Sequence, residues 1–95
     1  MTRRAVRVTG TVQGVGFRPY VFGLATSLGL SGFVGNDAGG VFIELQGPST
    51  AIERFLSRLV AEAPPMAAVD AVTADELPVL AGESRFDIVA SAESS

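Results

Sequence analysis

The sequence predicts a small α+β domain, in which a β-sheet is covered on one face by two helices. Length, apolar content and hydrophobic periodicity support this class. Ninety-five residues suffice for one domain, and a hydrophobic content of 47% is too high for a disordered chain. Segments of period two and period 3.6 follow one another along the chain, which favours strands and helices packed in two layers. We therefore expect a single domain over residues 1–95.

The first strand and the first helix are marked by a change of hydrophobic period. Valines alternate with polar residues over residues 5–12, as in a half-buried strand. A glycine-containing turn over residues 13–18 follows. Pro19 suits the first turn of a helix, and Gly29 suits the left-handed residue that ends one. Between them, the apolar residues at helical spacing are Val21, Leu24, Ala25 and Leu28.

The middle of the chain predicts a hairpin and a second helix. Residues 33–37 and 41–46 are strand candidates that should pair antiparallel, and we assign the positive φ angles of a tight turn to residues 38–40 between them. Residues 50–53 have the spacing of a capping box and begin a helix that Pro64 ends. The apolar residues of this helix are Ile52, Phe55, Leu56, Leu59 and Val60.

The last part of the chain completes the pattern. Residues 69–75 form a weaker strand candidate and residues 78–84 a loop. Residues 86–88 restore the alternation near the end, and residues 92–95 should fray. The resulting order is β-α-β-β-α-β. An antiparallel sheet with two helices on one face in this order is a ferredoxin-like βαββαβ two-layer sandwich.

The composition excludes several kinds of chemistry. The chain has no cysteine and no histidine, which excludes disulfides, thiolate metal sites, a cysteine nucleophile and the commonest general base. All seven basic residues are arginine, so a lysine Schiff base and a Walker-type phosphate loop are excluded as well. A net charge of −3 disfavours nucleic acid or an anionic membrane as a partner. The sequence contains no signal-peptide or bilayer-spanning stretch, and the cytoplasm is the expected compartment.

The turn after the first strand carries the strongest functional signal. Gly14 and Gly16 allow several backbone N–H groups to converge on one point, directly before the N-terminus of a helix. Arg18 adds a permanently charged fork of donors that matches a tetrahedral oxyanion. The alternative is that the glycines only form a tight turn and that Arg18 points to solvent. A dinucleotide fingerprint does not fit, because Pro19 stands where its third glycine is required.

Asn36, at the end of the second predicted strand, is a second candidate. Its amide both donates and accepts hydrogen bonds, so it could hold a water molecule in a fixed direction without becoming charged. The alternative is that Asn36 and Asp37 are ordinary hairpin residues with a high turn propensity.

Two segments together resemble the acylphosphatase family. Residues 10–18 (Gly-Thr-Val-Gln-Gly-Val-Gly-Phe-Arg) resemble its strand-loop motif, and residues 32–36 (Gly-Phe-Val-Gly-Asn), followed by Gly40 and Val41, resemble its second motif. The resemblance covers nearly the whole chain and implies a ferredoxin-like fold. It also implies hydrolysis of acyl phosphates to carboxylate and inorganic phosphate, without a metal or a cofactor. In that reaction Arg18 binds phosphate and Asn36 orients water. The backbone amides that match the family's phosphate cradle are those of Gln13, Gly14, Val15, Gly16 and Phe17.

A narrower resemblance concerns residues 17–21 and 36–41, which look like the N-terminal acylphosphatase-like domain of hydrogenase-maturation carbamoyltransferases. It implies carbamoyl phosphate as the substrate and further domains of a parent chain as partners. The tail at residues 89–91 resembles the point where such a chain continues, which leaves open whether this is a free-standing protein or an excised domain. Gly35 departs from the family, which often has a basic residue before the asparagine.

Two other functions stay open at this point. The first is a phosphate or carbamoyl-phosphate binding module that passes its ligand to neighbouring domains without hydrolysing it. The second is an RNA-binding βαββαβ domain, suggested by Phe42 within residues 40–43, where that fold carries stacking aromatic residues. The acidic balance and the absence of a matching aromatic residue in the first strand disfavour RNA.

Overall fold

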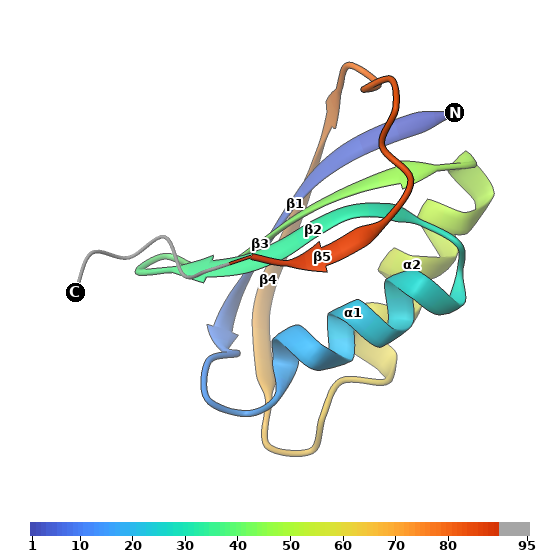
Figure 1. Cartoon of the computed structure of the whole chain (residues 1–95). Coiled ribbons are helices and arrows are strands. Elements are labelled where there is room, and N and C mark those ends of the chain that lie inside the picture. Colours follow the sequence, from blue (N-terminus) through green and yellow to red (C-terminus); the bar gives the residue numbers. More distant parts are fainter. Residues whose placement is uncertain (90–95) are drawn as a thin grey trace.

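A computed structural model describes residues 1–89 and confirms the ferredoxin-like fold (Figure 1). The elements are β1 (Thr2–Thr11), α1 (Phe17–Ser27), β2 (Ser31–Asp37), β3 (Gly40–Gly47), α2 (Ser49–Ala61), β4 (Ala68–Leu77) and β5 (Phe86–Ile88). Both helices lie on the same face of the sheet and leave the other face open (Figure 1). Within residues 1–89, neither helix has the length and apolar character needed to cross a membrane. The fraying expected at residues 92–95 lies outside the described part of the chain.

The sheet has the strand order β4-β1-β3-β2-β5. The pairs β1–β4, β1–β3 and β2–β3 are antiparallel as predicted, whereas β5 joins β2 as a parallel fifth strand. Because β1 and β2 are both antiparallel to β3, they run in the same direction. The C-terminal ends of β1 and β2 therefore lie at the same end of the sheet, and both sequence motifs are found there.

The core lies between the sheet and the two helices. The sheet contributes alternate residues of β1 and β3 together with Val34 of β2, and α1 and α2 contribute stripes at helical spacing. The predicted core positions Ile52, Phe55 and Leu59 of α2 are confirmed as fully buried. The prediction for Val60 is wrong, because its side chain is 51% exposed. One residue turns a helix by about 100°, so Val60 leaves the stripe that ends at Leu59.

The start of α2 differs from the predicted capping box. Pro48 is the N-cap, with φ −59° and ψ 141°, and no side chain caps the helix. Its carbonyl accepts hydrogen bonds from the N–H groups of Ala51 and Ile52, at 3.0 and 3.1 Å. Thr50 already lies inside the helix and cannot act as the cap. The restricted φ of proline is compatible with the backbone conformation of the residue before a helix. The helix therefore begins at Ser49, earlier than the capping box predicts.

The hairpin between β2 and β3 also differs in detail. Asp37 pairs with Gly40, so Ala38 and Gly39 form a two-residue turn. Neither of these two has a positive φ, which makes that part of the prediction wrong. Gly40 has a φ of 133°, and a Cβ there would lie 2.3 Å from the carbonyl oxygen of Val8. Glycine is required at this position by the close approach of β1.

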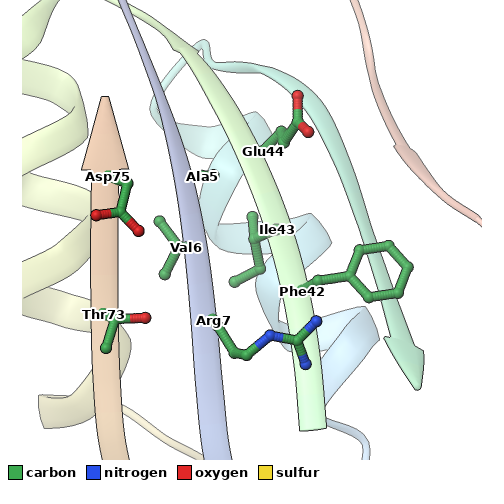
Figure 2. A pocket seen from close by; sticks show the side chains of 8 residues that line it. All are labelled: Ala5, Val6, Arg7, Phe42, Ile43, Glu44, Thr73 and Asp75. Carbon is green, nitrogen blue, oxygen red and sulfur yellow. The ribbon is translucent and has the colours of Figure 1, made fainter. Parts of the chain in front are cut away.

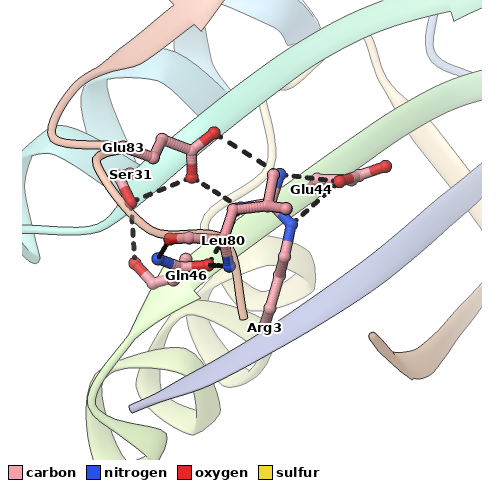
Figure 3. A network of polar contacts seen from close by, with 6 residues as sticks. All are labelled: Arg3, Ser31, Glu44, Gln46, Leu80 and Glu83. Carbon is pink, nitrogen blue, oxygen red and sulfur yellow. Dashed lines mark hydrogen bonds and ion pairs between the residues drawn. The ribbon is translucent and has the colours of Figure 1, made fainter. Parts of the chain in front are cut away.

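A polar network fixes the opposite end of the sheet (Figure 3). β1 begins at Thr2, earlier than predicted, and Arg3 is only 1% exposed. Its guanidinium contacts the carboxylates of Glu44 and Glu83, at 2.7 and 2.5 Å. Gln46 accepts from the N–H of Leu80 and donates to its carbonyl, at 2.8 Å each. A buried guanidinium requires such partners, and they fasten the loop between β4 and β5 across this end of the open face.

Candidate active site

The turn between β1 and α1 is anchored in the core at both ends. Val12 and Phe17 are each 1% exposed, and Val15 between them packs partly against the core. Gly14 and Gly16 have φ angles of 72° and 77°, in the left-handed region. A Cβ at either position would meet nothing within 4 Å. Glycine is therefore favoured here by backbone conformation and not by lack of space.

This turn presents a row of backbone N–H groups. Within residues 1–89, none of the N–H groups of residues 13–18 donates to a protein acceptor, and the helical series begins with the N–H of Tyr20 bonded to the carbonyl of Gly16 at 3.2 Å. Left-handed φ angles at Gly14 and Gly16, with a negative φ at the residue between them, give the alternation that is typical of the nest type of backbone concavity. The N-terminus of α1 follows at once and adds its positive dipole end. The arrangement suits an oxyanion.

Arg18 is the second residue of α1, immediately after this turn. Its side chain is partly exposed. No hydrogen bond or ion pair within residues 1–89 involves its guanidinium, whereas Arg3, Arg7, Arg58 and Arg85 are all paired with carboxylates. Its five donors are thus not committed to another part of the described fold.

Asn36 lies near the end of β2 and is 7% exposed. It pairs with Val41 of β3, which in turn pairs with Val8 of β1. Asn36 is therefore two strands from Val8, about 10 Å away. It lies at the same end of the sheet as the turn that follows β1. Alternation along β2 puts its side chain on the same face as the buried Val34, which is the face that α1 covers.

A side-chain hydrogen bond connects the two motifs directly. Nε2 of Gln13 donates to the backbone carbonyl of Asp37 at 2.7 Å. Arg7 of β1 holds the carboxylate of Asp37 with two hydrogen bonds of 2.8 Å, and the N–H of Gly39 donates to the same carboxylate at 2.9 Å. The hydrogen bonds from Arg7 lower the pKa of Asp37 from 3.8 to about 2. Sequence reasoning missed the contacts of Gln13 and Arg7 with Asp37, because no local pattern relates residues 24 and 30 positions apart.

Gly35, where the family often has a basic residue, is covered by an aromatic ring. A Cβ at Gly35 would lie 2.6 Å from Cζ of Phe42 and 2.7 Å from Cγ2 of Val89. Any larger side chain at this position requires Phe42 to move. The ring of the cross-strand neighbour therefore covers the open-face side of β2 at Gly35, whereas alternation puts the side chain of Asn36 on the opposite face.

The open face of the sheet carries a hollow of about 310 Å³ above Ala5 (Figure 2). Phe42 and the carboxylates of Glu44 and Asp75 flank it. Arg7, which also lines it, is already paired with Asp37. Carboxylates beside a paired arginine disfavour a nucleic-acid backbone on this face. Among residues 1–89, no group of three or more acidic residues is arranged to hold a metal ion.

Comparison with known proteins defines the class. The family model described as acylphosphatase matches residues 4–88. The chain therefore belongs to the acylphosphatase family, and the resemblance seen in its two motifs is confirmed.

The similar proteins are of two kinds. Carbamoyltransferase HypF2 of Cupriavidus necator is 45% identical over 92 residues, which are 97% of this chain and 11% of that protein. A crystal structure of full-length HypF in the phosphate- and nucleotide-bound form matches with a TM-score of 0.92 and 36% identity, over 97% of this chain and 12% of that one. Acylphosphatase from Bacillus subtilis matches with a TM-score of 0.86 and 37% identity, over 94% of this chain and 99% of that one. The chain thus resembles both a complete small acylphosphatase and about a tenth of a carbamoyltransferase.

Proposed function

We propose that this chain, acting as one domain, hydrolyses acyl phosphates to a carboxylate and inorganic phosphate. The observation that carries the proposal is the row of N–H groups at residues 13–18, which have no protein acceptor within residues 1–89 and lie at the N-terminus of α1. Amide donors and a helix dipole bind the phosphate oxygens, and Arg18 neutralises their charge. Membership of the acylphosphatase family supports this assignment.

Asn36 orients the attacking water. As the water oxygen forms a bond to phosphorus, the bond from phosphorus to the acyl oxygen breaks. The leaving carboxylate takes that electron pair, and both protons of the water end on inorganic phosphate. Since a carboxylate is a good leaving group, the reaction needs alignment and charge stabilisation more than a strong base. The absence of histidine and cysteine from the sequence is compatible with this chemistry.

Carbamoyl phosphate is the substrate that the similarity to HypF proteins favours, since those relatives are named carbamoyltransferases. The same similarity supports a second candidate function. A chain that matches 11% of such a relative could bind carbamoyl phosphate and deliver it to neighbouring domains of a hydrogenase-maturation enzyme without hydrolysing it. Turnover by the isolated chain separates the two functions.

The test measures phosphate release from benzoyl phosphate and carbamoyl phosphate by the purified 95-residue chain. We expect hydrolysis well above the spontaneous rate, and a loss of roughly 100- to 1,000-fold in the Arg18→Ala variant, as for removal of a transition-state donor. Arg54→Ala is the matched control, since Arg54 is an exposed arginine of α2 without an ion pair in the described fold. It should keep wild-type activity.

One result would contradict hydrolysis, and another would contradict the role assigned to Arg18. Phosphate binding without release above the spontaneous rate would favour the binding module. Equal losses in Arg18→Ala and Arg54→Ala would show that net charge, and not a specific contact from Arg18, governs the rate.

A further inference from the structure

Gln13 differs from its neighbours in the turn because its side chain also makes a defined contact. Its Nε2 reaches the carbonyl oxygen of Asp37 at 2.7 Å, across 24 positions of sequence. Its backbone N–H belongs to the row that we assign to phosphate. One residue is therefore attached to the phosphate cradle through its main chain and to the end of β2 through its side chain.

The acceptor of this hydrogen bond is itself held in place. Both oxygens of the Asp37 carboxylate are bound by Arg7, at 2.8 Å each, and one also accepts from the N–H of Gly39 at 2.9 Å. Asp37 is thereby fixed to β1 through its side chain. Because Asp37 follows Asn36 directly in β2, a contact that fixes its carbonyl also restrains the backbone that carries Asn36.

We propose that Gln13 is a positioning residue, whose side chain sets the separation between the amide cradle and Asn36. The inference rests on the proposed function. Water held by Asn36 must approach phosphorus in line with the breaking bond, and an error of about 1 Å in such an alignment costs roughly 100-fold in rate. The hydrogen bond from Gln13 to Asp37 joins the two elements whose relative position decides this alignment.

The fold itself does not depend on this contact. Val12 and Phe17 already anchor the turn in the core, at 1% exposure each. The side chain of Gln13 is exposed, and water competes for an exposed neutral hydrogen bond, which therefore adds little to stability. Because the side chain acts on the geometry of the site, its removal should lower kcat while the urea unfolding midpoint stays nearly unchanged.

The test uses Gln13→Met, which keeps the length of the side chain and removes its donor, together with Asn36→Ala and the double variant. For each, kcat and KM on benzoyl phosphate, the Kd for inorganic phosphate and the urea unfolding midpoint are measured. We expect Gln13→Met to lower kcat roughly tenfold, to change the phosphate Kd by less than about twofold, and to have no further effect when Asn36 is already alanine. Such non-additivity is not expected from a merely structural role.

Thr26→Val provides a matched control. Its hydroxyl also makes an exposed hydrogen bond to a backbone carbonyl, that of Phe22 at 2.8 Å, but within α1 and away from both motifs. It should leave kcat unchanged.

Each other outcome overturns the inference. An active wild type with an unchanged Gln13→Met variant overturns this inference alone. If Gln13→Met lowers kcat equally in the wild-type and Asn36→Ala backgrounds, its effect is a general structural one. If the phosphate Kd rises by the same factor as kcat falls, Gln13 acts on phosphate binding. A wild type without turnover overturns the proposed function as well, which distinguishes the two failures.

Discussion

Gly16 and Gly29 allow a sharp test of the phosphate cradle, because they lie at opposite ends of α1 in nearly the same conformation. Their φ angles are 77° and 71°, and a Cβ at either position would meet nothing within 4 Å. Substitution by alanine therefore adds backbone strain without a steric clash in both cases. Only Gly16 lies in the row of N–H groups that we assign to phosphate.

The size of the effects follows from this geometry. A left-handed conformation costs an L-residue about 1–2 kcal/mol, and the lower entropy of alanine in the unfolded chain offsets part of that cost. We expect Gly16→Ala and Gly29→Ala each to lower the free energy of unfolding by about 1 kcal/mol. In Gly16→Ala, relaxation of φ also turns the neighbouring N–H groups away from one another. Loss of a single charge-assisted hydrogen bond should then raise the phosphate Kd at least about tenfold.

Urea unfolding measures the first quantity, and calorimetric titration with inorganic phosphate measures the second. The assignment of the cradle is supported if both variants lose similar stability and only Gly16→Ala binds phosphate more weakly. If Gly16→Ala bound phosphate like the wild type, or if Gly29→Ala lost affinity to the same extent, the assignment of the cradle to this turn would be refuted.

Three further predictions concern catalysis, the core and pH. Asn36→Ala should lower kcat on benzoyl phosphate while the Kd for inorganic phosphate stays nearly constant, and equal losses in both would contradict its role in orienting water. Phe55→Ala should lower the free energy of unfolding by about 3–5 kcal/mol, since Phe55 is fully buried. Val60→Ala, on the exposed side of α2, should change it by less than about 0.5 kcal/mol. Comparable values for the two variants would place the core elsewhere. The pKa of Asp37 falls from 3.8 to about 2 in the folded state, so its pairing with Arg7 stabilises the fold above pH 4 and is lost as the pH falls toward 2. The stability difference between wild type and Asp37→Asn should shrink over that range, and a difference independent of pH in urea titrations would exclude this linkage.

Local patterns predicted most of the elements. The alternation in β1, the stripe on α2 and the left-handed Gly29 after α1 were correct because each depends on residues within a few positions of one another. Errors arose where a local signal had a competitor. The helix begins after Pro48 and not at the predicted capping box. Of residues 38–40, for which positive φ angles were predicted, only Gly40 has one, and there the close approach of β1 requires glycine.

Residue type and short-range spacing were sufficient to predict the order of helices and strands, the glycines of the turn and the chemistry of the residues near it. Three features depend on how the whole chain folds: β3 lies between β1 and β2, Gln13 contacts Asp37, and Arg3 is buried between two carboxylates. Those contacts join residues 24 to 80 positions apart. They depend on which surfaces the whole chain can bury together, and no short segment contains that information.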